Sequence, residues 1–289
     1  MKEAIWKSIA GFVKVSKYPF LPCPYCGAES LSLDARSLHV RPLPDSYKEI
    51  ASRHFRDLKS EKLKSLSETG EVVKDVFETQ PLLGFLIGLG AVAAELQADI
   101  ENMAQSIAFF QCGGCEASVS AVGLAKVYTA RTGEQHKQET EVKFEYFTPS
   151  IPMIPLSEHL PREIKIELLD AFKHYHFDPP SAASKLRRAI EKFCQSQGAK
   201  GTNLHRQIDS LKATLPLEAQ YLEALKLVGN EGTHSNGVDE GDLLLAFKVI
   251  QYVLEFFDRK KRFEETTPDY EKIQEKFNSQ LIGRDPVKA

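Results

Sequence analysis

Two pairs of cysteines are the residues whose type and spacing point most directly to chemistry. Cys23 and Cys26 stand in the sequence CPYCG, and Cys112 and Cys115 stand in CGGCE. Two C-x-x-C pairs supply four thiolates, which is the ligand set of a closed structural zinc site. The sequence therefore predicts one structural zinc ion, with a long insertion between its two ligand pairs.

A redox dithiol is the alternative interpretation of a C-x-x-C pair. The strand-then-helix context of a thioredoxin-like motif is missing here, which favours the metal. The fifth cysteine, Cys194, lies on the apolar face of an expected helix and is interpreted as a small core residue.

A second group of polar residues lies in the sequence KLVGNEGTH, which runs from Lys226 to His234. Asn230 can position a phosphate or cap a helix, and a histidine can act as a general acid or base near neutral pH. In the structural alternative, Asn230 caps a helix and His234 hydrogen-bonds within the loop that follows Gly229.

Two arginines upstream bear on the same group. Arg187 precedes Glu191 by four residues, so the two can form an ion pair on one helix face. In the alternative, Arg187 or Arg188 points toward the loop of Asn230 and binds an anion. A third polar group, of His174, His176 and Asp178, has the residue types of a metal site, but histidines at a helix end more often bond carbonyl groups.

Composition limits the protein classes. The chain has 289 residues, 42% hydrophobic and 27% charged, with a net charge of -3. These values indicate a globular chain of about two domains, and they exclude a disordered or fibrous protein. Near-neutral charge argues against a protein that coats nucleic acid by bulk charge. Local nucleic-acid recognition through Arg36, His39 and Arg41 of the zinc-ribbon region remains a third interpretation.

The pattern along the chain predicts a mainly α protein. A helix is expected from Leu82 to about Phe110. Short strands are expected in the zinc-ribbon-like region, with a clear signal after the second cysteine pair and a weaker one around the first. We expect a zinc-ribbon-like domain at residues 1–148, with a helical insertion at about 44–111. A proline-rich linker at 149–159 leads to an up-and-down helical bundle at 160–263 and a polar tail at 264–289.

Local signals mark the ends of the bundle helices. Asp178 or Ser181 is the expected cap of the second helix, Gly198 its end, and Gly229 the break after the fourth. The most apolar run, from Leu82 to Ala94, is shorter than the roughly 20 residues of a membrane span, so we expect a buried helix there. No signal-peptide pattern is present at the start of the chain, and we expect a cytoplasmic protein without a membrane segment.

Four segments of the C-terminal half occur in a characteristic order. They are LPREI at 160–164, DPPSAA at 178–183, LRRAIE at 186–191 and GNEGTH at 229–234. This run resembles a domain-of-unknown-function family found beside restriction and defence proteins, and it looks like a member of the HEPN superfamily of helical bundles. Many relatives also carry an N-terminal C-P-x-C-G zinc ribbon.

The resemblance implies a homodimer through the helical bundle and an RNA or protein partner. Active HEPN proteins are metal-independent endoribonucleases with an Arg, a polar residue and a His in a site at the dimer interface. His234 matches the histidine and Asn230 the polar residue, whereas Lys226 stands where the family has arginine and lacks its bidentate fork.

Two hypotheses follow from these residues. The first is a zinc-stabilised HEPN-like binding or regulatory protein, set in bacterial defence or restriction. The second is an endoribonuclease in which His234 assists attack of a ribose 2′-hydroxyl, Lys226 and Arg188 stabilise the phosphate charge, and Asn230 orients the phosphate.

Overall fold

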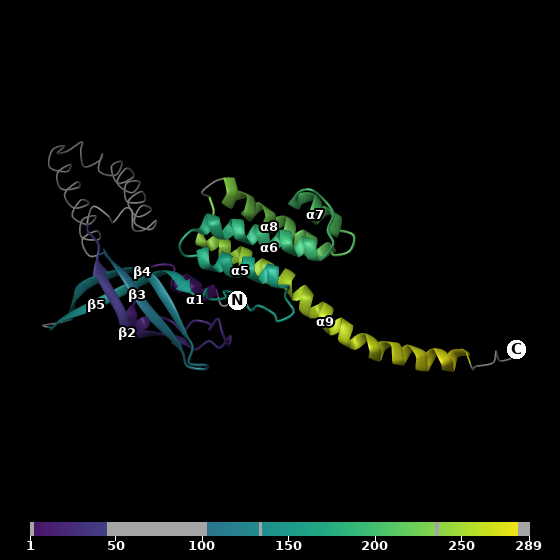
Figure 1. Ribbon diagram of the computed structural model, residues 1–289, viewed down its shortest axis with the longest axis horizontal. Coiled ribbons are helices and arrows are strands. Elements are labelled where there is room, and N and C mark those ends of the chain that lie inside the picture. Colours follow the sequence, from purple (N-terminus) through teal and green to yellow (C-terminus); the bar gives the residue numbers. More distant parts are fainter. Residues whose placement is uncertain (1–2, 45–102, 133–134, 235–236, 283–289) are drawn as a thin grey trace, which may run out of the picture.

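The computed structural model describes residues 3–44, 103–132, 135–234 and 237–282. It has an antiparallel sheet in the N-terminal half and helices in the C-terminal half (Figure 1). The expectation of a mainly α chain with only short strands is therefore wrong. Most of the expected insertion at 44–111 lies outside the described residues, including the apolar run that begins at Leu82.

The sheet has five strands in the order β1-β5-β4-β3-β2, and every neighbouring pair is antiparallel. Helix α1 (Glu3–Ser8) precedes the first strand, and a short 3-10 helix (Val15–Lys17) follows it. The strands are β1 (Val13–Lys14), β2 (Leu31–Pro42), β3 (Met103–Cys112), β4 (Ser118–Thr132) and β5 (Gln135–Thr148).

Strand β3 occupies part of the segment that was expected to be helical. Its side chains alternate between buried and exposed, but the buried positions include Ala104, Ser106 and Ala108, which are small or polar. The exposed positions include Ile107 and Phe109, which are 48% and 49% exposed. Because apolar residues lie on both faces, the sequence lacks the alternation of polarity from which a strand is normally predicted.

The N-terminal segment covers one face of the sheet, which we call the inner face. Trp6, Ile9 and Leu21 of this segment are buried in the same core as the inner-face side chains of the strands. The Tyr18 ring lies edge-on to Phe110 and Phe144, with centroid distances of 5.4 and 5.5 Å. The N-terminal segment, in which irregular chain joins α1 and the short 3-10 helix, therefore closes the inner face.

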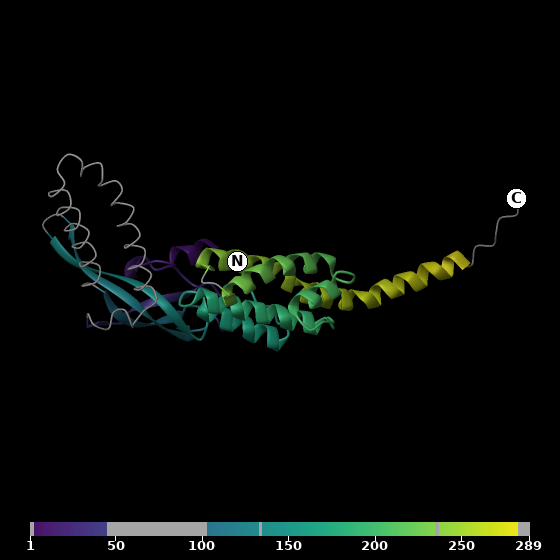
Figure 2. The same cartoon turned by 90° about the horizontal axis from the view of Figure 1, so that it is seen from above.

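Five helices form the described C-terminal half: α5 (Arg162–His174), α6 (Pro179–Ser196), α7 (Leu204–Leu211), α8 (Pro216–His234) and α9 (Glu240–Ile282). Asp178 caps α6, accepting a hydrogen bond from the Ser181 amide, and Gly198 follows α6 with a positive φ of 70°. Figure 2 shows that α9 continues well past the other helices.

Helix α8 does not end at Gly229. It runs on to His234, so the expected loop around Asn230 is wrong within the described backbone. Gly229 faces α6, and a Cβ atom placed on it would lie 2.8 Å from the Cβ of Arg187. The glycine therefore permits close contact of two helices instead of ending one.

The two halves share one apolar core. Phe147 at the end of β5, Ile151 and Met153 of the linker, and Phe172 of α5 belong to the same buried cluster as Trp6 of α1. Of the helices that lie within the described ranges, none is long and apolar enough to cross a membrane.

The close contact between β4 and β5 predicts a steric effect at Gly123. This glycine lies at a register shift, and a Cβ atom there would overlap the carbonyl oxygen of Lys143 and lie 2.7 Å from the Cα of Phe144. We expect Gly123→Ala to lower the free energy of unfolding by about 3 kcal/mol, measured by urea denaturation. Gly11→Ala is the matched control, because no atom lies within 4 Å of a Cβ at Gly11. Equal denaturation midpoints for the two variants would contradict this packing.

Candidate functional site

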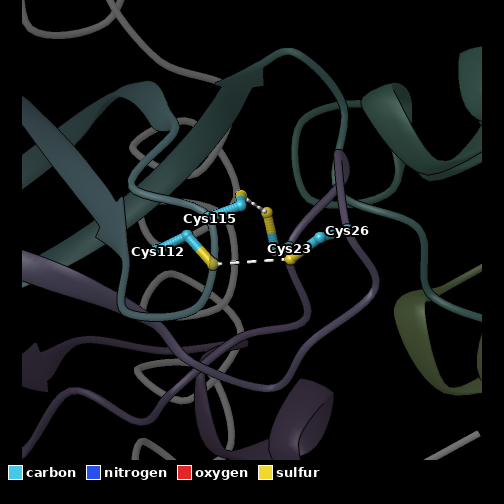
Figure 3. Close-up of side chains that lie close together, drawn as sticks. All are labelled: Cys23, Cys26, Cys112 and Cys115. Carbon is cyan, nitrogen blue, oxygen red and sulfur yellow. Dashed lines mark hydrogen bonds between the residues drawn. The ribbon is translucent and has the colours of Figure 1, made fainter.

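Two turns at one end of the sheet bring four cysteines together. Cys23 and Cys26 lie in the turn before β2, and Cys112 and Cys115 lie at the β3–β4 turn (Figure 3). Register pairing of Leu31 with Cys112 places the two turns side by side. All four sulfur atoms lie within 4.8 Å of one another, so the four cysteines form one compact cluster.

The two turns have the same backbone geometry. The amide of Cys23 donates to the Ala28 carbonyl at 2.8 Å, and the amide of Gly27 donates to the Cys23 carbonyl at 2.9 Å. In the second turn the amide of Cys112 donates to the Ala117 carbonyl at 3.0 Å, and the amide of Glu116 donates to the Cys112 carbonyl at 2.9 Å. The residue after each second cysteine has a positive φ, 73° at Gly27 and 61° at Glu116. Two equivalent turns therefore present two sulfur atoms each to a common point.

The sulfur distances suit a tetrahedral metal site. The Cys23 and Cys115 sulfurs are 3.7 Å apart, and so are those of Cys26 and Cys112. Four sulfurs at about 2.3 Å from a central zinc would be about 3.8 Å apart. All five cysteines lie within the described residues and none forms a disulfide. Both 3.7 Å contacts join different C-x-x-C pairs, which argues against a dithiol within either pair.

Hydrogen bonds favour the thiolate form at Cys112. The hydroxyl of Ser30 lies 3.2 Å from its sulfur, and the Gly114 amide donates to that sulfur at 3.3 Å. Ser30, followed by the amides of Cys115 and Gly114, lowers the pKa of Cys112 to about 6. The Ala117 amide lowers the pKa of Cys115, but neighbouring thiols and burial raise it overall to about 12. Without a cation, the four thiols cannot all ionise, because each thiolate disfavours the next.

A second cluster with metal-ligand residue types lies on the helices. His205, Asp209 and Glu223 bring one ligand atom each within 4.8 Å of one another. The ammonium of Lys212 lies 2.7 Å from Asp209 and 2.8 Å from Glu223. A protein cation therefore already pairs with both carboxylates, and this cluster forms an ion-pair network between α7 and α8.

The polar group predicted around Asn230 lies between α6 and α8. The guanidinium of Arg187 donates to the side-chain oxygen of Asn230, and its Nε donates to Glu191 at 3.3 Å. The Gly229 contact with Arg187 brings these helices close enough for that hydrogen bond. Arg187 therefore lies between an amide oxygen and a carboxylate, and its charge is satisfied within the chain.

The other candidate residues lie in different surroundings. Arg188 pairs with the buried Glu167 of α5 at 2.7 Å, and Lys226 lies 3.3 Å from a ring nitrogen of His205 on α7. His234 is the last residue of α8, one turn after Asn230, and its side chain is outside the described part of the structure. Sequence spacing gave no means of choosing between Arg187 and Arg188 as the partner of Asn230, because that choice depends on the helix contact at Gly229.

His174, His176 and Asp178 do not form a metal cluster. Asp178 caps α6, and His176 is buried among the rings of Trp6, Phe147 and Tyr175. Both ring nitrogens of His176 lack a hydrogen-bond partner, and the Glu240 carboxylate lies 3.9 Å from one of them. Burial, more than any other effect, lowers the pKa of His176 and keeps it neutral.

The helical half matches a known family model. That model describes a domain of unknown function, DUF4145, and it matches residues 170–277. The match includes α6, α7, α8 and most of α9, and it leaves out the cysteine cluster and the sheet. No curated protein and no solved structure matches the chain. The comparisons therefore place a domain of unknown function in the helical half and give no activity.

The cysteine geometry predicts tight binding of one metal ion per chain. We expect elemental analysis of the purified protein to find about one equivalent of a thiophilic divalent metal. Cys115→Ser should lose most of it, because three sulfurs leave the tetrahedral set incomplete. Cys194→Ala is the matched control, since Cys194 is buried in α6 outside the cluster. Unchanged metal content in Cys115→Ser would contradict a four-cysteine site.

Proposed function

We propose that the protein is a zinc-stabilised binding protein whose four-cysteine centre is structural. The observation that carries this proposal is the pair of equivalent turns whose sulfurs lie 3.7 Å apart. Four protein ligands fill a tetrahedral zinc and leave no position for water or substrate, whereas catalytic zinc sites keep one open. The metal would hold the N-terminal segment against the sheet. A cytoplasmic setting fits this role, because the thiols must stay reduced.

The helical half is proposed to be a HEPN-like binding or regulatory module. The internal pairing of Arg187 with Asn230 and Glu191, and of Arg188 with Glu167, supports this role, because the arrangement is satisfied without a ligand. A homodimer through the bundle and a setting in bacterial defence or restriction rest on the resemblance of the LRRAIE and GNEGTH segments.

Single-stranded nucleic acid is the partner that best suits the outer face of the sheet. Ile107 and Phe109 of β3 are about half exposed there, and Val122 of β4, paired with Ile107, is 42% exposed. His39 and Arg41 of β2 are exposed and pair with Ile107 and Gln105. Paired residues of an antiparallel sheet share a face, so aromatic, apolar and basic groups lie together, and the carboxylate of Asp34 lies on the same face, paired with Phe109.

This combination of residues suits stacking of bases on an aromatic ring more than binding of nucleic acid by bulk charge. Exposed aromatic side chains on a sheet stack with bases irrespective of sequence, and nearby basic groups follow the phosphates. The net charge of -3 argues against an extended phosphate-binding surface, so the local group is the relevant one. Arg36, exposed in the irregular segment of β2 between Asp34 and His39, adds a further cation at this edge.

The proposed interface predicts a specific loss of affinity. Phe109→Ala should weaken binding of a fluorescently labelled single-stranded RNA by about tenfold in an anisotropy titration, because one stacked base is worth about 1–3 kcal/mol. Arg41→Gln should reduce the slope of log affinity against log salt by about one. Leu217→Ala is the control, because Leu217 is an exposed apolar residue on α8. Equal affinities for Phe109→Ala and Leu217→Ala would contradict the interface.

A second candidate function is metal-independent RNA cleavage at the α6–α8 contact. The observation that favours it is the guanidinium of Arg187 at Asn230, with His234 one turn later along α8. His234 would take the proton of a ribose 2′-hydroxyl as that oxygen attacks the adjacent phosphorus. A 2′,3′-cyclic phosphate forms, the bond to the 5′-oxygen breaks, and the leaving 5′-oxygen takes a proton from water. Arg187 or Arg188, with Lys226, would stabilise the phosphate charge, and Asn230 would orient it.

Cleavage of this type predicts insensitivity to chelators. The wild-type protein should cut a labelled mixed-sequence RNA in excess EDTA, and His234→Ala should abolish cutting. His159→Ala, which alters an exposed linker histidine, is the control. Absence of cutting by the wild type, or full cutting by His234→Ala, would reject this candidate and leave the binding function in place.

A further inference from the structure

The C-terminal part of α9 lacks a packing partner within the described chain. Helix α9 has 43 residues, and its first turns are buried in the bundle through Leu243, Phe247, Ile250 and Leu254. From residue 260 to residue 277 every described residue is exposed or half-exposed. Figures 1 and 2 both show this part projecting away from the other helices. A lone helix of this length is marginally stable in water, so it requires an additional source of stability.

Aromatic residues recur along α9 at intervals of seven. They are Phe256, Phe263, Tyr270 and Phe277, and Ile273 follows Tyr270 by three. Phe263, Tyr270, Ile273 and Phe277 are 73%, 59%, 60% and 54% exposed. A repeat of seven with positions a and d apolar is the pattern of a coiled coil, because it keeps one stripe facing a supercoiled partner.

The stripe continues onto the bundle part of α9. With the aromatic residues at position a, Ile273 lies at position d, and Tyr252 and Leu245 lie at d positions earlier in α9. Tyr252 is 38% exposed and Leu245 is 58% exposed. Pro268 falls at position f, on the face opposite the stripe, so its ring does not interrupt the contact surface. We call the exposed residues Leu245, Tyr252, Phe263, Tyr270, Ile273 and Phe277 the α9 stripe.

We propose that the α9 stripe pairs with that of a second copy of this chain in an antiparallel coiled coil. In the antiparallel register that sets Phe263 against Thr266 of the second copy, Phe277 meets Tyr252 and Phe256 meets Ile273. Arg259, at the d position between Tyr252 and Thr266, meets Tyr270. The same register places Glu255 beside Lys276, and Arg262 beside Asp269, all at position g. Each pair occurs twice, so four attractive contacts flank the seam. A parallel pairing in register would offer one type of attractive contact between the two chains, that of Glu255 with Lys260.

The exposed area is sufficient for a dimer. Leu245 lies outside the paired length of α9, and the other five side chains of the α9 stripe expose roughly 500 Å² per chain, taking about 150–250 Å² for a whole aromatic side chain. Two copies would bury about 1,000 Å² from these residues alone, which is the area that a specific interface should reach. This interface lies outside the α6–α8 contact, so it is separate from the dimer that the HEPN resemblance implies.

The first experiment measures the mass of the full-length protein in solution by sedimentation equilibrium. We expect Ile273→Asp to have half the mass of the wild type, because a carboxylate in the seam would be buried without a partner. The change is from dimer to monomer if α9 alone pairs the chains, and from tetramer to dimer if the proposed bundle contact pairs them as well. Lys272→Asp, which introduces the same group at the adjacent position off the stripe, should keep the mass of the wild type. A monomeric wild type, or an Ile273→Asp variant with the same mass as Lys272→Asp, would overturn the proposal. Circular dichroism of each variant checks that the helices are retained.

The second experiment tests the direction of pairing. Glu255→Lys should weaken the dimer by setting it against Lys276, and adding Lys276→Glu should restore the affinity. A parallel pair would gain nothing from the second substitution, so failure to restore affinity would overturn the antiparallel arrangement. Metal content, and binding of an RNA too short to reach two outer faces, should be unchanged in the same variants, because neither the cysteine cluster nor the outer face of the sheet includes α9.

Discussion

Mutual repulsion of four sulfur atoms is the constraint on which the N-terminal half depends. Two turns far apart in the sequence bring Cys23, Cys26, Cys112 and Cys115 within 4.8 Å of one another. Hydrogen bonds from Ser30 and Gly114 favour charge on Cys112, while its neighbours oppose further ionisation. A divalent cation resolves this conflict by pairing with all four ligands. The two turns also anchor the N-terminal segment that covers the inner face, so separation of the four cysteines would expose apolar core as well as four thiols.

Local chemistry made part of this structure predictable. The cysteine pairs, the Asp178 cap and the Gly198 terminus each depend on a few adjacent residues, and each was found from the sequence. Strand β3 was missed because small residues fill its inner face while Ile107 and Phe109 lie on its outer face. The continuation of α8 through Gly229 was missed because the reason lies on another helix, where Arg187 needs the space. Strand β3 and the continuation of α8 therefore depend on contacts between elements of the fold, which the spacing of residues in the sequence does not reveal.

A neutral histidine lies where the two halves meet. The His176 ring lies 6.2 Å from the ring centroids of both Trp6 and Phe147, one from α1 and one from β5. Glu240 raises the pKa of His176, whereas burial and Lys143 lower it, and burial has the largest effect. Protonation of His176 is therefore less favourable in the folded chain than in the unfolded chain, where its ordinary pKa is 6.5. The contribution of the neutral His176 ring to the free energy of unfolding is complete above that pH and declines as the pH falls below it. The junction is accordingly a point of acid sensitivity distinct from the metal centre.

The positions of the sheet and of α9 relate the two proposals to one another. The sheet lies at one end of the molecule, and the projecting part of α9 ends at the other (Figure 1). Antiparallel pairing of two α9 helices would therefore separate two outer faces, and each would bind its own stretch of a strand. Linked sites raise apparent affinity only when the ligand can span them. A short oligonucleotide would thus occupy one face at a time, whereas a long strand would engage both, so the length of the bound strand would determine how much dimerisation contributes to its affinity.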